Sequence, residues 1–420
     1  MHRTPLRLAA VGVVAGLALA GCTAGPAPDA PVEVTVWHYW DGTNADTFDA
    51  MVDEFNASHD DIVVSTSNVP NADFLTKLRA SATSKTLPDV AIGDLVWVPQ
   101  IAQIGTLADL SGMLPADVLS DINPALTAFG TIGGEQVSVP VSANNLGYLY
   151  NKTLFEEAGL DPNDPPTTWE ELKADGAKIV AATGKQAYEL FTQAGDNGEG
   201  LTWNFQVNLW QAGGEFLTAD NSAAAFNTPA GRTALQYWVD LIDSGISKVG
   251  AWGEFGSGNA ASATDGSWMV GIWAPDPPFD FGSGTAPYPE DGTPATNLGG
   301  EQAMVFENSD EKAAAAAEFL SWFLEPEQVL SWSETTGMLP VTNSIATGDE
   351  YLSWVDENQP LLRPYVEQMA VAHARPNTPL YPAISLAFAK EIEKALAGEV
   401  SVDDALANAE SAVNAVIAKG

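Results

Sequence analysis

The chain has 420 residues, 45% of them hydrophobic, and a formal net charge of −38 from 55 acidic and 17 basic side chains. A chain of this length exceeds the size at which one hydrophobic core stops growing, so we expect two lobes. The excess of acids opposes binding to nucleic acid, and one Cys with four His argues against disulfides and a multi-His metal site. We therefore expect no nucleic-acid partner, no metal and no cofactor.

The first 21 residues read as a signal peptide. Arg3 and Arg7 precede an apolar run over residues 8–20 that is too short to span a bilayer. The run ends in LAGC, which looks like the lipobox of bacterial lipoproteins, in which the Cys receives a diacylglyceryl group. We expect lipid on Cys22 to hold the protein on the extracytoplasmic face of the cell membrane, with residues 22–31 as a tether. An ordinary secretory signal with an incidental Cys is the alternative.

Strands and helices alternate after the tether. Apolar and β-branched runs predict strands over residues 32–37, 62–65 and 88–92, and helical spacing predicts helices over 47–55 and 74–84. This β-α-β-α-β order predicts a mostly parallel sheet with helices on its faces. Ligands of such sheets lie beyond the carboxyl ends of the strands, so the residues that follow the three strands are expected around one rim.

The rest of the chain is read more coarsely. Residues 136–149 are predicted to form an extended crossover into a second, mostly helical lobe. Further crossovers are expected at 287–294 and 337–340, and a strand at 303–306 is expected to return to the first lobe. The C-terminal part is helical, with one helix over 312–324, an apolar stripe at i, i+4 spacing from Ile384 to Leu396, and a last helix opened by Ser401 and Asp404.

Residues 150–172, YNKTLFEEAGLDPNDPPTTWEEL, carry the most specific pattern. They resemble a segment of the extracellular solute-binding proteins of bacterial ABC importers, in the carbohydrate- and glycerophosphate-binding group. In that family a crossover ends in Tyr-Asn-Lys, a short helix ends in Ala-Gly-Leu, and Pro-x-Thr-Trp-x-Glu-Leu opens the next helix. The parts also make local sense, because Gly159 suits the left-handed end of a helix and Thr168 with Glu171 fits a capping box.

The resemblance implies an α/β, two-lobed periplasmic-binding-protein-like fold. Each lobe would be a mostly parallel sheet flanked by helices, and three hinge crossovers would let the lobes close on a ligand. We expect residues 32–141 and 290–338 in the N-terminal lobe, and residues 142–289 and 339–420 in the C-terminal lobe. The implied function is that of a monomeric binding protein that delivers a sugar to ABC permease subunits and catalyses no reaction.

Aromatic residues after the first strand are the first site candidates. The chain has 13 Trp, and aromatic rings beside planar polar side chains suit the faces and hydroxyls of a sugar. Tyr39, Trp40 and Asp41 leave the strand at the rim, whereas Trp37 continues the strand alternation into the core. The Trp-His pair at residues 37–38 is similar to a segment of the glycerophosphate-binding members.

Polar residues near the other strand ends and the first crossover are further candidates. Asp73 and Asp94 each come after a strand, although Asp94 is equally suited to capping the next turn. Asn144 lies in the first crossover, where it is placed either to hydrogen-bond a ligand or to pack in the hinge.

Five Trp compete for a place in the second lobe. Trp203 and Trp210 are seven residues apart on one helix face, which is more typical of a core. We favour Trp273, since relatives place an aromatic or small residue against the ligand in that segment, and then Trp252.

Three candidates come from the resemblance alone. In the glycerophosphate binders a Gly, an aromatic before Leu-Pro, and the Arg of an Arg-Pro step contact the ligand, and the matching residues are Gly300, Met338 and Arg375. Met338 departs from the pattern, because its thioether donates no hydrogen bond to a phosphate oxygen. Arg375 is then the one clear candidate for binding an anion, unless it joins helix ends instead.

Four readings of function remain open at this point, one of them an adhesive or scaffolding lipoprotein that binds no small molecule. A carbohydrate-binding protein of an importer is preferred. The same fold with a glycerophosphodiester or other phosphorylated polyol as cargo is the first alternative. A secreted glycoside hydrolase is a weaker one, because it needs a pair of carboxylates across a cleft and no spacing in the sequence marks such a pair.

Overall fold

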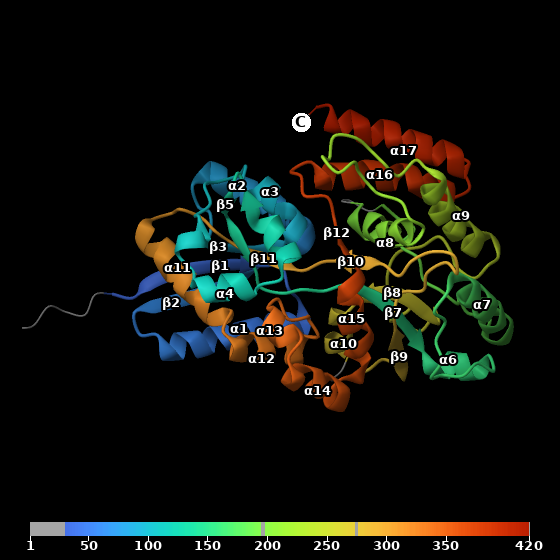
Figure 1. Cartoon of the computed structure of the whole chain (residues 1–420), viewed down its shortest axis with the longest axis horizontal. Helices are drawn as coiled ribbons and strands as arrows, with labels where there is room; N and C mark the ends of the chain where they lie inside the picture. Colours follow the sequence, from blue (N-terminus) through green and yellow to red (C-terminus); the bar gives the residue numbers. More distant parts are fainter. Residues whose placement is uncertain (1–29, 195–197, 274–275, 420) are drawn as a thin grey trace, which may run out of the picture.

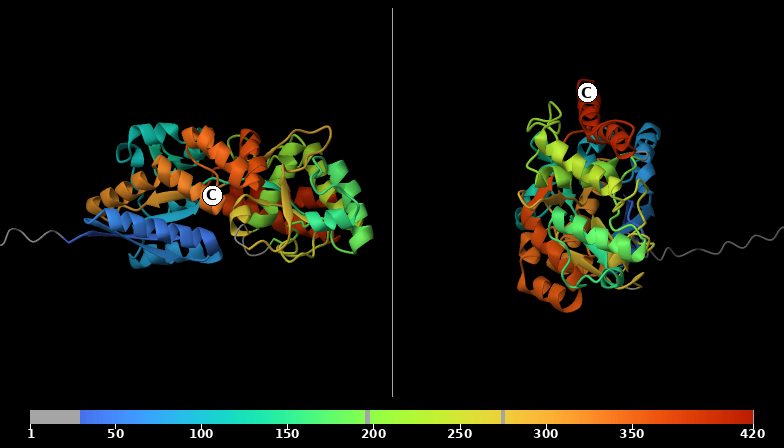
Figure 2. Two further views of the ribbon diagram at one scale, coloured as in Figure 1. Left: turned by 90° about the horizontal axis from the view of Figure 1, so that it is seen from below. Right: turned by 90° about the vertical axis from the view of Figure 1, so that its right-hand side faces the viewer.

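The computed structural model of the chain describes residues 30–194, 198–273 and 276–419. Two lobes lie side by side along the long axis, with α1, α2 and α11 in one and α6, α7 and α9 in the other (Figures 1 and 2). The predicted signal peptide, Cys22 and nearly all of the tether lie outside the described residues. Within those residues, no helix combines the length and apolar character needed to cross a bilayer.

The N-terminal lobe is built on a five-stranded sheet with the order β2-β1-β3-β11-β6. β1 pairs in parallel with β2 and β3, which confirms the predicted β-α-β-α-β unit, while β11 runs antiparallel between β3 and β6. Alternate residues of β1, including Val34 and Val36, face the core. The strands are β1 Val32–His38, β2 Ile62–Asn68, β3 Val90–Asp94, β6 Ser138–Pro140 and β11 Glu301–Val305.

Helices cover this sheet because each buries one apolar face. Phe48, Met51, Val52 and Phe55 line the buried side of α1, which packs on β2, and α11 packs on β1 and β11. The helices of this lobe are α1 Gly42–Ser58, α2 Asn71–Ser84, α3 Val98–Ile101, α4 Ala116–Asp121, α5 Pro124–Thr127, α11 Asp310–Phe323, α12 Pro326–Thr336 and α13 Asn343–Ala346. A 3-10 turn, η1 Leu95–Trp97, follows β3, and β4 Thr131–Ile132 with β5 Glu135–Gln136 form a small hairpin.

The sheet of the C-terminal lobe differs from the mostly parallel one we expected. Its strands β7 Leu146–Asn151, β8 Ser262–Gly266 and β9 Phe281–Gly284 form the order β8-β7-β9, and both pairings are antiparallel. β7 enters the lobe from the first crossover, whereas β8 ends beside Leu146, at the end of β7 nearest the crossover. Parallel bridges from Gln186 and Glu189 to residues 260 and 263 extend the sheet.

Helices surround this sheet. α8 packs against α9 and α16, and α17 lies along α16 at the edge of the lobe (Figure 1). The helices are α6 Lys152–Glu157, α7 Trp169–Thr183, α8 Glu199–Gln211, α9 Pro229–Asp243, α10 Trp268–Trp273, α14 Asp349–Asn358, α15 Arg363–Gln368, α16 Tyr381–Leu396 and α17 Val402–Ile417. A short parallel pair, β10 Thr296–Leu298 and β12 Ala372–Ala374, lies between α8 and the crossovers.

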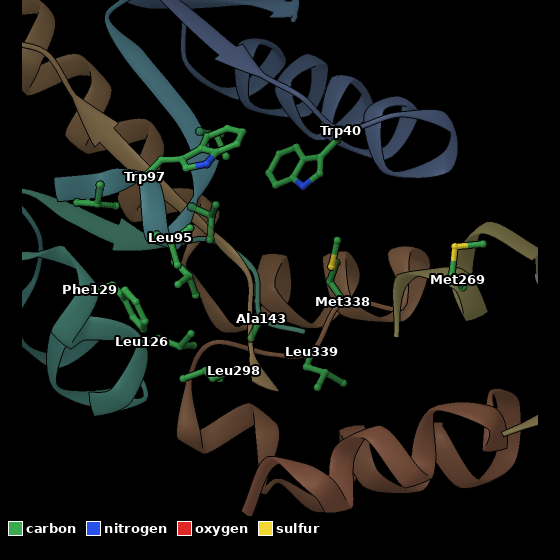
Figure 3. Packing of buried hydrophobic residues seen from close by; sticks show 14 of the residues in the cluster. Trp40, Leu95, Trp97, Leu126, Phe129, Ala143, Met269, Leu298, Met338 and Leu339 are labelled. Atoms are coloured by element: carbon green, nitrogen blue, oxygen red, sulfur yellow. The ribbon is translucent and has the colours of Figure 1, made fainter. Parts of the chain in front are cut away.

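Three chain segments meet where the lobes join. Ala143 pairs with Leu339 and Asn144 pairs with Gly299, so each crossing segment is hydrogen-bonded to another. Figure 3 shows Ala143, Leu298 and Leu339 gathered at this junction, with Met338 beside them. Gly300 has a φ of 137°, and a Cβ there would collide with the carbonyl of Ser142, so only glycine fits this close approach.

The expected second crossover at residues 287–294 is wrong. Tyr288 pairs with Thr168, and Thr293 donates to the carbonyl of Gln211, so this stretch lies within the C-terminal lobe. The chain crosses later, at residues 298–301. The segment after Leu339 also stays beside the N-terminal lobe, because Thr342 pairs with Ile122. We propose a last lobe boundary near residue 348 in place of residue 339.

Candidate ligand-binding cleft

A cavity of about 590 Å³ lies between the lobes. This volume falls in the range of about 300–1,000 Å³ that is usual for small-molecule sites. Its wall combines residues that follow β1 and β3, residues of the crossing segments and residues of the C-terminal lobe. The predicted residues that line it are Tyr39, Trp40, Asp41, Asp94, Asn144, Trp252, Gly300, Met338 and Arg375.

Asp73 and Trp273 are not brought to this cavity. Asp73 is exposed in the first turn of α2, whose inner face is made by Phe74 and Leu78, and Asn71 takes the place at the cavity wall. The Trp273 ring packs against Phe255 at 5.5 Å and Phe281 at 5.4 Å. Trp273 therefore belongs to an aromatic cluster of the C-terminal lobe and not to the cavity wall.

Two tryptophans that line the cavity were missed. The rings of Trp203 and Trp268 stack at 5.6 Å with an angle of 7° between their planes. Trp210, which shares the predicted helix face with Trp203, is buried against His373 instead. No pattern in the sequence distinguishes the two positions, because the difference arises from where α8 meets the crossing segments.

Acidic side chains were missed as well. Glu199, Asp265 and Glu301 line the cavity together with Asp41 and Asp94. The chain has 55 acidic residues, and none of these three has a local spacing that marks it. For Glu301 alone, a strand predicted to begin at residue 301 would have indicated the site, because such a strand places Glu301 opposite Asp94 at the rim.

Arg375 is the central cation of the cleft, and its charge is already compensated. Its Nη2 donates to Asp94 Oδ1 at 2.8 Å and its Nη1 to Glu199 Oε1 at 2.7 Å, with 1% of the side chain exposed. Burial by itself lowers the pKa of Arg375, but the two carboxylates outweigh it and raise that pKa. We call Arg375, Asp94 and Glu199 the Arg375 cluster; it joins β3 of one lobe to α8 of the other.

Glu199 has further partners within the C-terminal lobe. The hydroxyls of Tyr381 and Ser385 donate to its carboxylate at 3.0 Å and 2.7 Å. Burial raises the pKa of Glu199 despite the neighbouring Arg375. The carboxylate is therefore fixed on the α16 side of the cleft.

Glu301 lies on the N-terminal side of the crossing segments. The Tyr39 hydroxyl donates to its Oε1 at 2.8 Å, and the Ser142 hydroxyl donates to Oε2. Burial raises the pKa of Glu301 and holds that of Tyr39 well above its usual value. The Tyr39 phenol therefore stays neutral and donates to the Glu301 carboxylate on this side of the cleft.

Several buried polar atoms of the cavity wall have no protein partner. They are Asn44 Oδ1, Asn144 Oδ1, Trp40 Nε1, Trp203 Nε1 and Arg375 Nε. Buried polar groups in folded proteins are nearly always hydrogen-bonded. Two acceptors and three donors are thus left for a ligand, whereas no group of three or more His, Cys, Asp and Glu within the described ranges is arranged to hold a metal ion.

Trp252 contributes an aromatic face from the C-terminal lobe. Its side chain is among the few large apolar ones that are exposed, at 53%, and its Nε1 donates to Asp265 Oδ2 at 2.8 Å. With Tyr39 and Trp40 across the cavity, apolar rings and carboxylates alternate around the cleft. That combination suits a ligand that has both C–H faces and hydroxyls.

A family model described as bacterial extracellular solute-binding protein matches residues 50–358. The chain belongs to this family. Its members bind solutes and catalyse no reaction, so the glycoside hydrolase alternative falls away. The α/β periplasmic-binding-protein-like fold expected from the sequence is confirmed by solved structures of this kind.

Relatives of this solute-binding protein include sugar-binding proteins and an sn-glycerol-3-phosphate-binding protein. The crystal structure of the cyclic alpha-maltosyl-1,6-maltose binding protein from Arthrobacter globiformis is 75% identical, with a TM-score of 0.86 over 93% of this chain and all (100%) of that one. An ABC transporter solute-binding protein from Thermotoga lettingae, bound with alpha-D-tagatose, is 26% identical with a TM-score of 0.80, over 92% of this chain and 100% of that one. The sn-glycerol-3-phosphate-binding periplasmic protein of Yersinia pestis is 27% identical over 75% of each chain.

Proposed function

We propose that this chain is the substrate-binding component of an ABC importer for a neutral oligosaccharide of α-linked glucose units. A relative at 75% identity over 93% of the chain is named for binding cyclic alpha-maltosyl-1,6-maltose, which supports that class of ligand. The observation that carries the proposal is the cavity wall, in which aromatic faces lie beside five carboxylates.

The chemistry of this wall suits a sugar. Tyr39, Trp40, Trp203 and Trp252 offer rings for the apolar C–H faces of pyranoses. Ionised carboxylates accept hydrogen bonds only, and sugar hydroxyls are donors for those, such as Asp41, whose oxygens the described residues do not already use. Asn144 Oδ1 and Trp203 Nε1 add one acceptor and one donor that the protein leaves unused.

A phosphorylated polyol is the weaker candidate. A phosphate group needs a cation or several N–H donors. Both Nη atoms of Arg375 already donate to Asp94 or Glu199, which leaves only its Nε without a partner among the described residues. Asp41, Asp265 and Glu301 add negative charge to the same cavity. An anionic ligand would therefore have to displace a carboxylate or approach several others.

The test is binding by residues 23–420 to matched ligands. We expect cyclic α-maltosyl-1,6-maltose to raise the unfolding temperature, because a ligand at a hundredfold excess over Kd stabilises the native state by about 2.7 kcal/mol. Maltotetraose, a linear chain of four glucose units, shows whether the ring is required. Glycerophosphocholine and sn-glycerol-3-phosphate should have no effect; stabilisation by either of them alone would refute the proposal.

Binding is coupled to movement of the lobes. Ligand shifts the balance between open and closed forms in proportion to its difference in affinity for them. The closed protein then presents both lobes to the permease subunits. We propose that the protein acts as a monomer in this step, and sedimentation of the liganded domain as a dimer would contradict that.

We also propose that lipid on Cys22 holds the protein on the extracytoplasmic face of the cell membrane. The LAGC motif supports this anchor. A protein with a net charge of −38 is repelled by anionic lipid, so electrostatic attraction cannot hold it on the membrane in place of the lipid chain. In cells fed a radiolabelled fatty acid, the full chain should take up label and sediment with membranes. The Cys22→Ser variant should do neither, and labelling of that variant would contradict the assignment.

A further inference from the structure

Two carboxylates in the C-terminal lobe are buried without a cation. Glu189 and Asp265 are each 4% exposed, and neither forms a salt bridge with any described residue. Burial raises the pKa of Glu189 and raises that of Asp265 to about 6. An unpaired charge is costly to bury. The hydrogen bonds that these two carboxylates accept should therefore indicate their role.

Both bind the same loop, residues 250–258, which carries Trp252. The carboxylate of Glu189 accepts from the backbone N–H of Gly253 at 2.5 Å and from that of Phe255 at 2.6 Å. Asp265 accepts the indole N–H of Trp252 on Oδ2 and the N–H of Gly266 on Oδ1, each at 2.8 Å. One carboxylate thus fixes the backbone of the loop, and the other fixes the ring that the loop presents.

The loop is tied at its ends, by Thr192 to Gly250 and by Lys185 to Gly258, but the Trp252 ring itself is held by the bond to Asp265. The loop contains four glycines, and Gly253 and Gly258 have φ values of 116° and 69°. The Trp252 side chain is 53% exposed, so packing alone does not fix it. A ring ordered before the ligand arrives loses less conformational entropy on binding, which increases affinity.

We infer that Glu189 and Asp265 are positioning residues that hold the Trp252 indole in place as a rigid face for one sugar ring. The inference rests on the proposed function, and it assigns the two carboxylates no contact with the ligand. It also explains why carboxylates are used. Each accepts two hydrogen bonds, one per oxygen, whereas an amide side chain in the same orientation would place its NH2 group against one of the two N–H donors.

A double-mutant cycle tests the inference, with calorimetric Kd values for cyclic α-maltosyl-1,6-maltose. Trp252→Ala and Asp265→Asn should each weaken binding about tenfold, since a hydrogen bond to a charged group and an ordered aromatic contact have effects of that size. In the Trp252→Ala background, Asp265→Asn should have less than about a twofold further effect. Equal losses in both backgrounds would mean that Asp265 contacts the sugar itself, and would overturn the inference, as would full affinity of Asp265→Asn.

Glu254→Gln is the matched control, because Glu254 is an exposed acid on the same loop and undergoes the same change of carboxylate to amide. It should bind like the wild type. Glu189→Gln should weaken binding in the wild-type background and not in the Trp252→Ala background. If Asp265→Asn does not fold, Trp252→Phe is the substitute, because it removes the indole N–H that donates to Asp265 and leaves the carboxylate in place. Trp252→Phe should weaken binding, and unchanged affinity of this variant would overturn the inference.

A second measurement needs no ligand. The ¹⁵N-indole NMR signal of Trp252, assigned by its loss in Trp252→Phe, should exchange slowly with solvent in the wild type and in Glu254→Gln. In Asp265→Asn it should shift and exchange faster. If the wild type binds no sugar, the proposed function fails while this signal still decides the positioning role: an unchanged signal in Asp265→Asn would overturn it.

Discussion

Arg375 shows what a single residue reveals only in three dimensions. The sequence predicts it as an anion contact, since it matches the Arg of the Arg-Pro step in the glycerophosphate-binding relatives. The structure surrounds it with Asp94 and Glu199, which are 281 and 176 residues away in sequence. No local pattern reports such separations, so the sequence predicts Arg375 and Asp94 as separate site residues, not as partners, and does not predict Glu199.

The Arg375 cluster should dominate stability among the ion pairs. Arg375→Ala leaves two carboxylates near the buried position without their cation, and we expect a loss of about 3–5 kcal/mol in the free energy of unfolding. Arg232→Ala is the control, because both side chains of the Arg232–Asp403 pair are more than half exposed and the pair should contribute less than about 1 kcal/mol. Urea unfolding of the ligand-free domain measures both, and equal losses would contradict the prediction.

Asp265 should make the protein more stable in mild acid. Its pKa is raised by burial from 3.8 to about 6, so the native state binds a proton more readily than the unfolded chain. Stability from this group is therefore gained as pH falls through about 6, and we expect about 1 kcal/mol between pH 7 and pH 5.

Urea unfolding at the two pH values tests this. In Asp265→Asn the gain between pH 7 and pH 5 should be smaller by that amount, whatever the absolute stability of the variant. Asp41→Asn, at an exposed position on the rim, should keep the full gain. If Asp265→Asn gained as much free energy of unfolding between pH 7 and pH 5 as the wild type, the pKa of Asp265 would not be raised in the native state.

At the scale of elements, local patterns predicted what depends on neighbouring residues. The alternation of strands and helices over β1 to β3, the left-handed Gly159 and the capping box of α7 are all present. The direction of the second sheet and the place of the second crossover were wrong. Both depend on pairing partners distant in sequence, such as Tyr288 with Thr168, and apolar periodicity carries no information on them.

The capping box of α7 offers a test at this scale. The Thr168 side chain accepts the N–H of Glu171, and the Glu171 carboxylate accepts the N–H of Thr168 in return. Thr168→Ala should lower the free energy of unfolding by about 1 kcal/mol. Thr335→Ala, the same substitution at an exposed position of α12, should change it by less than about 0.5 kcal/mol. Similar values for the two variants would mean that the cap contributes nothing.

At the scale of the whole molecule, the sequence indicated two lobes and a ligand between them but not the composition of the cleft. Residues at strand ends and in the crossing segments were predicted, since fold geometry brings such positions to one rim. Trp203, Trp268 and the three missed carboxylates come from α8, α10, β8 and β11. Their place in the cleft follows from how the two lobes face each other, which one-dimensional spacing does not encode.

The Arg375 cluster should also influence how far the lobes open. Asp94 belongs to the N-terminal sheet, whereas Glu199 begins a helix of the C-terminal lobe. Asp94→Asn weakens the link on one side only, so we expect a larger radius of gyration for the ligand-free domain in small-angle X-ray scattering. Asp41→Asn makes the same change at the rim without a bond across the cleft and should leave the radius unchanged. An unchanged radius in Asp94→Asn would show that other contacts hold the lobes together.

The position of β11 in the first sheet has a consequence for how the protein is made. β11 lies between β3 and β6, although residues 141–300 separate it from β6 in sequence. A ribosome therefore releases the whole C-terminal sheet before the N-terminal sheet can be completed. The facing edges of β3 and β6 must wait without a partner until residues 301–305 have been synthesised.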